Sequence, residues 1–262
     1  SGWYARMREK IAKALGDKAE FFAQLLGATS AQTPVEENFN QAYEAMTLAR
    51  QGKYDSMVKR YLEMLDLVKG GKIEEVARKR GIVRLKEIKG KSKSDRIKFI
   101  QKRWVERYNL IPLRSNGKKY NANSMAVMKV LAGVWLQTTK SPKTKNFSGN
   151  LSGRTIEATI DVWAARLLRR LLYDGQEKWR IQPASETGVS NHDFAVSQII
   201  FRKAADKLNI NPDDLQAIVW FGEKGVWDTN GWTGEVGAYK SSFDEPFDVY
   251  FPEGQQPRNM RE

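Results

Sequence analysis

The stretch from Ser141 to Arg170 carries the residues of this chain whose types and positions are best suited to chemistry. It opens with a Pro-Lys-Thr turn that contains Lys143, passes a Gly/Asn/Ser-rich loop and enters an apolar helix at Asp161. A carboxylate at the start of a helix otherwise flanked by Lys and Arg indicates a functional role. The sequence therefore predicts Asp161 as a catalytic carboxylate, with the Lys143 turn holding a phosphate backbone in front of it.

The charge of the chain indicates the kind of partner. Its 262 residues carry a formal net charge of +13, and a basic surface of this size favours polyphosphates, mainly through counterion release. The charge is unevenly placed, because Lys and Arg far outnumber Asp and Glu between residues 69 and 119. We therefore expect a nucleic acid as the partner rather than a merely basic protein.

The residue types that are missing exclude several classes of protein. Cysteine is absent, which excludes disulfides, thiolate zinc sites and cysteine-ligated iron–sulfur clusters. The chain has a single His, so its composition favours neither a His-based metal site nor a Ser-His-Asp triad. No apolar run approaches the length of about eighteen residues that a membrane span needs. We expect a cytoplasmic protein with no membrane, metal or cofactor partner.

Apolar periodicity and capping residues predict a mostly α fold. Helices are expected over residues 3–15, 19–28, 34–50, 55–68, 73–80, 95–108, 124–137, 162–170, 193–208 and 212–224. Long loops are expected over 109–123 and 173–191. The tail from Gly225 is rich in Gly, aromatic and acidic residues, and we expect it to form a hairpin or to wrap irregularly.

Three separated segments resemble one superfamily, the helix-hairpin-helix DNA glycosylases of the endonuclease III and adenine glycosylase type. The first, Phe22–Thr33, reads FAQLLGATSAQT and is similar to that family's buried helix ending in a Ser-Ala-Gln-Thr turn. By resemblance, Gln32 enters the duplex and fills the gap left by an extruded base, a role that suits an amide at a corner between helices. The alternative is an ordinary capping turn.

The second segment, Thr159–Arg170, reads TIDVWAARLLRR and looks like the family's Val-Asp-Thr-His-Val-x-Arg-Val-x-x-Arg-Leu segment. Val162 and Trp163 stand where the family has Thr and His. The resemblance implies that Asp161 is the general acid/base or the stabiliser of an oxocarbenium ion, since an anion beside the sugar stabilises the positive charge that builds there. Asp161 also fits the N-cap of a helix beginning at Val162, and the two roles are compatible.

The third segment is the turn before it. Bifunctional members of the family have a Lys eighteen residues before the Asp, and Lys143 has this spacing to Asp161. The resemblance implies that Lys143 could attack the sugar C1′ and form a Schiff base; the alternative is a phosphate contact. The family's hairpin glycines are absent from this turn, so charge alone would hold phosphate. The expected DNA-binding residues are Gln32, Lys140, Ser141, Thr144, Lys145 and Arg166.

The family's iron–sulfur loop is also absent, and aromatic residues stand in its place. We expect Trp163, Glu223 and Trp227 at a base pocket, although Trp227 and Trp232 could equally close the core. The resemblance implies a single two-lobed helical glycosylase-like domain, monomeric and bound to double-stranded DNA. Its expected parts are a lobe with the basic insert (30–137), a lobe with both ends (1–29 and 138–222) and an irregular aromatic C-terminal tail (223–262).

Three functions follow from these observations. The first is a base-flipping enzyme of a bacterial or phage-infected cell that cleaves the N-glycosidic bond of a damaged or modified base in duplex DNA. The second resembles a phage-encoded branch of the superfamily that is thought to transfer amino acids or polyamines onto pyrophosphorylated 5-hydroxymethyluracil in DNA. The third is a DNA-binding module without catalysis, in which Asp161 only caps its helix.

Overall fold

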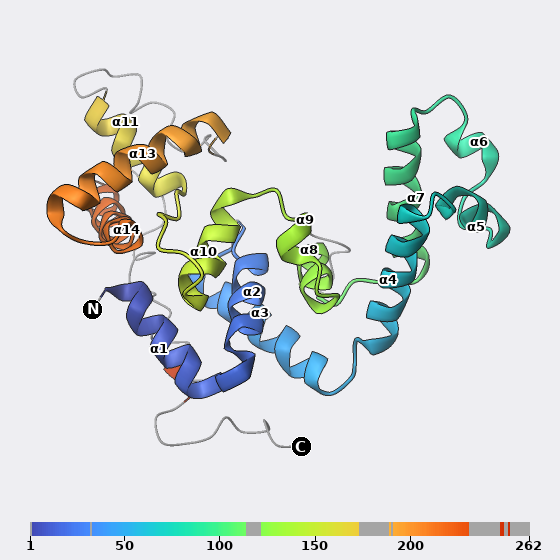
Figure 1. The fold of residues 1–262 in the computed structure, drawn as a ribbon, viewed down its shortest axis with the longest axis horizontal. Helices are drawn as coiled ribbons and strands as arrows, with labels where there is room; N and C mark the ends of the chain where they lie inside the picture. The colour runs from blue at the N-terminus through green and yellow to red at the C-terminus, as the bar shows by residue number, and fades with distance from the viewer. Residues whose placement is uncertain are drawn as a thin grey trace. The chain divides into compact units, whose positions relative to one another are not determined.

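The structure, a computed structural model, describes residues 2–31, 33–113, 122–172, 189, 191–230, 247–248 and 251. Helices make up most of these residues, and no strand occurs among them (Figure 1). The expected mostly α class is therefore confirmed. None of the helices in the described ranges combines the length and the apolar content needed to cross a membrane.

The chain divides into two compact units. The first comprises Ser1–Asn40 and Lys140–Glu262, and the second Gln41–Thr139. The sequence places the boundaries of the inserted lobe near residues 30 and 137. The structure places the first boundary later, inside helix α3 (Val35–Arg50), and the second at nearly the same position.

Six further α-helices belong to the first unit and position its candidate residues. They are α1 (Trp3–Leu15), α2 (Ala19–Thr29), α10 (Pro142–Ser152), α11 (Val162–Leu172) and α13 (Asn191–Leu208), together with α14 (Pro212–Thr229), which completes the unit. Helix α10 packs against α1 and α2, while α14 packs against α1, α11 and α13 (Figure 1). Helix α1 therefore contacts both α10 and α14, which are far apart in the sequence.

Local signals set the ends of these helices. Helix α1 ends at Gly16, which has a φ of 51°, a conformation that glycine adopts without a Cβ clash. Helix α14 continues to Thr229. The residues from Glu223 onward that were expected to begin the irregular tail therefore form the last turns of this helix. Trp232 and most of the tail lie outside the described residues.

The stretch expected as a turn followed by a Gly/Asn/Ser-rich loop is instead a helix, so that expectation was wrong. Ser141 caps α10, since its Oγ accepts a hydrogen bond from the Thr144 amide at 3.4 Å, and Pro142 lies in the first turn. The helix ends at Gly153, in the left-handed conformation. Its small polar residues are poor helix formers, but Ser148 and Gly149 are buried, and their small size lets neighbouring segments approach closely.

Gly149 is the point of closest approach in α10. A Cβ added there would lie 2.6 Å from Cγ2 of Thr155. We expect Gly149→Ala to lower the free energy of unfolding by about 1–3 kcal/mol because of this overlap. Chemical denaturation would measure the loss. Thr155→Ser removes only the methyl group that the new Cβ would overlap, so the double variant should recover most of the lost stability. If the stability is not recovered, the overlap with Thr155 is not the cause of the loss.

The second unit is built around its own apolar core. Its helices are the remainder of α3, α4 (Asp55–Lys69), α5 (Ile73–Lys79), α6 (Leu85–Ile88), α7 (Lys93–Arg107), α8 (Ala122–Leu131) and α9 (Trp135–Thr138). Trp104, Ile100, Ile88 and Met64 are buried together in the core. The single helix expected over 124–137 is broken into α8 and α9 around Gly133, whose φ is 69°.

The surface of the second unit carries most of the basic residues between 69 and 119. Many of these side chains are exposed, among them Lys72, Lys79, Lys86, Lys93, Lys98 and Lys102. Some basic residues pair with acids, as Arg80 does with Glu63 at 2.6 Å. The excess of cations nevertheless leaves this unit with a strongly basic surface.

A buried acid begins α14 and makes stability depend on pH. Asp213 is buried, and its Oδ1 accepts a hydrogen bond from the Asp214 amide at 2.9 Å. Burial, together with the neighbouring Asp214 carboxylate, raises the pKa of Asp213 from 3.8 to about 6, although Arg8 opposes the shift. The folded protein therefore binds this proton more tightly than the unfolded chain, so its contribution to stability is present below pH 3.8 and is lost as the pH rises through about 6.

We expect Asp213→Asn to raise the free energy of unfolding at pH 8 by about 1–3 kcal/mol, because the amide carries no charge to bury. The gain should disappear at pH 4, where the wild-type carboxyl is largely protonated. Denaturation curves between pH 4 and 8 would measure both values. Asp206→Asn, at an exposed position of α13, is the matched control; an equal gain from it would contradict this explanation.

Candidate functional site

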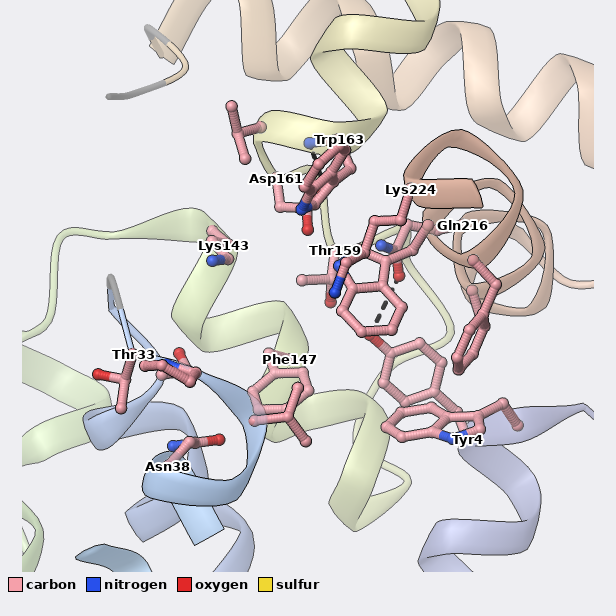
Figure 2. Close-up of a pocket in the computed structure, with 18 residues that line it drawn as sticks. Tyr4, Thr33, Asn38, Lys143, Phe147, Thr159, Asp161, Trp163, Gln216 and Lys224 are labelled. Atoms are coloured by element: carbon pink, nitrogen blue, oxygen red, sulfur yellow. Dashed lines mark hydrogen bonds between the residues drawn. The ribbon is translucent and has the colours of Figure 1, made fainter. Parts of the chain in front are cut away.

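A cavity of about 490 Å³ lies within the first unit and is lined by residues from α1, the corner between α2 and α3, α10, the start of α11, and α14 (Figure 2). Its volume falls in the range of roughly 300–1,000 Å³ typical of small-molecule sites. Six of its eighteen lining residues are aromatic, namely Trp3, Tyr4, Phe147, Trp163, Trp220 and Phe221. Its charged lining residues are Lys143, Asp161 and Lys224. The described residues thus form an apolar cavity with a few charged groups.

Asp161 combines the two roles expected from the sequence. Its Oδ1 accepts hydrogen bonds from the Trp163 and Ala164 amides, each at 3.0 Å, so it caps α11. The residue also lines the cavity and is only 7% exposed. Burial raises the pKa of Asp161 above its ordinary value, while Lys143, the two amide donors and Lys224 act in the opposite direction. The cap therefore fixes a buried carboxyl group at the cavity wall.

Polar side chains hold the extended segment that leads to Asp161. Asn150 donates from Nδ2 to the Glu157 carbonyl at 3.0 Å and to the Thr159 hydroxyl at 3.1 Å. Asn146 and Gln198 both donate to the Ala158 carbonyl. The Asn residues of α10 thus tie the segment after it back onto the helix. This arrangement brings Asp161 near the first turn of α10.

Lys143 lies in that first turn and lines the same cavity. Figure 2 shows its side chain on one side of Asp161, with Lys224 on the other. The electrostatic effect of Lys143 on the pKa of Asp161 reflects this proximity. The two residues expected to be catalytic are therefore brought together.

The corner between α2 and α3 forms another part of the wall. Asn38 donates to the Leu26 carbonyl at 2.9 Å and to the Thr29 hydroxyl at 2.6 Å, which fixes this corner. Ser30 and Thr33 both line the cavity. Gln32, the expected intercalating residue, lies outside the described residues.

The lining also includes polar residues that the sequence did not suggest. Tyr4 donates from its hydroxyl to Oε1 of Gln216 at 3.1 Å. Burial raises the pKa of Tyr4 well above its ordinary range, so its hydroxyl keeps its proton. Gln216, Trp220 and Lys224 come from α14 at four-residue intervals, and all three line the cavity. That spacing places polar residues on an otherwise apolar helical face, which is the signal that could have identified them.

Lys224 is a buried lysine beside Asp161 in the cavity. It is 8% exposed, and its Nζ lies 4.2 Å from the centre of the Trp220 ring and 5.8 Å from that of Trp163. Cation–π contacts of this kind offset part of the cost of burying an ammonium group. The site therefore has two lysines, of which the sequence suggested one.

The other residues expected at a base pocket form a cluster behind the lining. Arg166 packs against both Trp163 and Trp227, with its guanidinium carbon 4.3 and 4.4 Å from the two ring centres. Glu223 accepts hydrogen bonds from Arg170 at 2.7 and 3.2 Å and from the Trp227 indole at 2.8 Å. Of Trp163, Glu223 and Trp227, only Trp163 lines the cavity. The cluster supports one cavity wall.

The remaining residues expected to bind DNA lie along the start of α10. Lys140, Ser141 and Lys145 are exposed. Thr144 is buried and donates from its hydroxyl to the Ser141 carbonyl at 3.2 Å. The two lysines thus flank the helix N-terminus on the protein surface, whereas Thr144 stabilises the turn itself.

The described residues contain no group of three or more His, Asp or Glu side chains arranged to hold a metal ion. The chemistry available at the cavity is that of a buried carboxyl group, two amines and aromatic surfaces. The described residues thus define a mostly helical protein with a charged aromatic cavity. Residues 108–226, less than half of the chain, match a family of unknown function (DUF7178). Neither the curated proteins nor the solved structures gave a match.

Proposed function

We propose that this protein is a DNA glycosylase-like base-flipping enzyme that uses Asp161 to cleave the N-glycosidic bond of a modified base in duplex DNA. One observation carries the proposal: Asp161 and Lys143, the pair selected by the resemblance to helix-hairpin-helix glycosylases, line one aromatic cavity. The two residues are eighteen positions apart in the sequence, and this spacing alone did not require them to line the same cavity. Their shared position supports the proposed chemistry.

The cavity suits an extruded nucleotide. Its aromatic walls can hold a flipped base, with the deoxyribose towards Asp161. As the bond between C1′ and the base nitrogen breaks, its electron pair leaves with the base and positive charge develops on the sugar. Ionised Asp161 stabilises this charge where little water screens it. A water molecule then adds to C1′, and the proton that it loses is taken up by the departed base, which completes the hydrolysis.

The surroundings of the cavity suit a polyanionic substrate. Lys140 and Lys145 are exposed beside Lys143 at the start of α10, where the helix dipole also favours a phosphate group. The exposed lysines of the second unit add a further basic surface. We propose that duplex DNA is the partner of both surfaces, with affinity that falls steeply as salt increases.

A screen of duplex oligonucleotides, each with one modified base, tests the proposal. Release of a free base from at least one duplex, detected by chromatography and mass spectrometry, is expected. Salt-dependent binding without a product from any duplex would overturn the proposal in favour of a DNA-binding module.

A transfer reaction on the same scaffold is the second candidate, favoured by the presence of Lys224 as well as Lys143 in the cavity. Two ammonium groups suit a base that carries pyrophosphate as a leaving group. Incubation of DNA containing pyrophosphorylated 5-hydroxymethyluracil with amino acids or polyamines would distinguish the reactions. Nucleoside mass spectrometry should show a heavier nucleoside after transfer and a free base after hydrolysis.

A further inference from the structure

Two buried amide side chains of the cavity, those of Asn38 and Gln216, use only part of their hydrogen-bonding capacity. Both residues line the cavity and are only 2% and 3% exposed (Figure 2). Asn38 belongs to α3 and Gln216 to α14. A buried amide ordinarily finds partners for both its nitrogen and its oxygen. Within the part of the chain that the structure describes, each of these two has partners for only one of the two atoms.

In Asn38 the nitrogen is engaged and the oxygen is not. Nδ2 donates to the Leu26 carbonyl at 2.9 Å and to the Thr29 hydroxyl at 2.6 Å. A carbonyl group can only accept, so the contact with Leu26 fixes which end of the amide is the nitrogen. No described residue donates to Oδ1, which Figure 2 shows on the side of Phe147, another lining residue. Asn38 therefore offers the cavity a hydrogen-bond acceptor of fixed direction.

In Gln216 the oxygen is engaged and the nitrogen is not. The Tyr4 hydroxyl donates to Oε1 at 3.1 Å. Burial raises the pKa of Tyr4, whereas Thr159 and Asn150 lower it through hydrogen bonds, as donors to its oxygen do. The proton of the hydroxyl is thus left for Gln216. Because none of the described residues accepts from Nε2, Gln216 offers the cavity two N–H donors.

Together the two amides define what a ligand must present. An acceptor such as a carbonyl oxygen must meet Gln216, and a donor such as an N–H group must meet Asn38. An ionised carboxylate suits Gln216 but has no hydrogen to donate to Asn38. The fold already holds both amides in place, so a rigid ligand loses little further freedom on binding. A lactam ring carries a carbonyl and an N–H group in one rigid unit and meets these conditions.

We infer that the cavity binds a neutral lactam ring, with Gln216 donating to a carbonyl oxygen of the ring and Asn38 accepting from a ring N–H group. The inference rests on the proposed function in one respect, namely that the ring is a nucleotide base. Asp161 acts at the sugar, whereas the two amides select the base. A ring that keeps its carbonyl groups but has no N–H group should therefore bind poorly.

NMR titrations with free rings test the inference without DNA or catalysis. Uracil and hypoxanthine are lactams of different size, and 1,3-dimethyluracil and 1,9-dimethylhypoxanthine keep the carbonyl groups but have no N–H. We expect at least one lactam to bind about 10-fold or more tightly than its methylated counterpart, because the counterpart leaves the buried Asn38 oxygen without a donor. The added methyl groups would favour the counterpart in an apolar cavity if the N–H groups did not matter.

Substitutions at Gln216 test the contact with the carbonyl group. Gln216→Glu keeps an acceptor for the Tyr4 hydroxyl but replaces the two donors by a second acceptor, so it should weaken lactam binding about 10-fold or more. Gln216→Met removes the donors without adding a charge and should also weaken binding. Gln24→Glu, on α2 in the same unit and outside the cavity lining, is the matched control and should leave binding unchanged. Denaturation curves would establish that each variant is folded.

The inference is overturned if neither lactam binds, or if each methylated ring binds as tightly as its lactam. Undiminished binding by folded Gln216→Glu would contradict the assigned direction of the amide. Lactam binding without base release from any duplex would contradict the glycosylase proposal and leave this ligand class standing. Base release that is unaffected by both Gln216 substitutions would support the glycosylase and contradict this inference.

Discussion

Asp161→Asn is expected to abolish base release while DNA binding and folding are retained. The amide cannot provide the negative charge that stabilises the sugar as the glycosidic bond breaks, and loss of such a group costs about 10²–10⁴-fold in rate. Its oxygen can still accept the hydrogen bonds that Asp161 receives from the Trp163 and Ala164 amides, so α11 should remain capped. Single-turnover release of the base and a separate binding titration would measure the two effects.

A second substitution separates the cap from the catalytic role. Asp161→Ala removes the acceptor as well, so it should lose about 1 kcal/mol of stability in addition to the rate. Burial raises the pKa of Asp161 above 3.8, the ordinary value for Asp, and the ionised carboxylate is the active form. As the pH is lowered, the wild-type rate should therefore begin to fall before the pH reaches 3.8. A normal rate in Asp161→Asn would overturn the assignment of Asp161.

Borohydride treatment in the presence of abasic DNA is expected to link the protein covalently to the DNA through Lys143. An amine that attacks the C1′ aldehyde expels water to form an imine, and borohydride reduces this imine to a stable secondary amine. Lys143 lies in the same cavity as Asp161, so its amine is positioned for this attack. Lys143→Ala removes the nucleophile, so it should reduce the yield of the adduct to about a few per cent of the wild-type yield or less.

Two controls identify the linked amine. Lys203→Ala removes an exposed lysine of α13 that does not line the cavity and should leave the adduct unchanged. Peptide mapping by mass spectrometry should find the modification at Lys143 rather than at Lys224, the other lysine of the cavity. Absence of an adduct would mean that cleavage proceeds by hydrolysis alone and that Lys143 contacts phosphate. An adduct at Lys224 would reassign the nucleophile.

Local sequence signals identified many of the helices and the capping role of Asp161. Gly16 ends α1 at the expected position, and Asp161 accepts hydrogen bonds from the amides of α11 as an N-cap should. Such features depend on a few neighbouring residues, which is why they can be read from the sequence. The basic surface of the second unit follows from composition in the same way.

The same local reasoning failed for α10, where composition indicated a loop. Its Asn, Ser and Gly residues have low helix propensity. In the structure Asn146 and Asn150 hold the returning segment by hydrogen bonds, while Gly149 permits its close approach. These partners lie outside the helix, so no pattern within the helix reveals them.

The sequence by itself determined the helical class, the basic charge and the carboxylate at the start of α11. Only the tertiary structure decided what surrounds that carboxylate. The packing of α14 against α1 and α11 brings Lys224 and Gln216 to the cavity. Trp227 instead packs against Arg166 and hydrogen-bonds Glu223, outside the cavity lining. The physical reason is that capping and helical periodicity act over a few residues, whereas the composition of a cavity depends on contacts between distant segments, whose apolar faces are buried together.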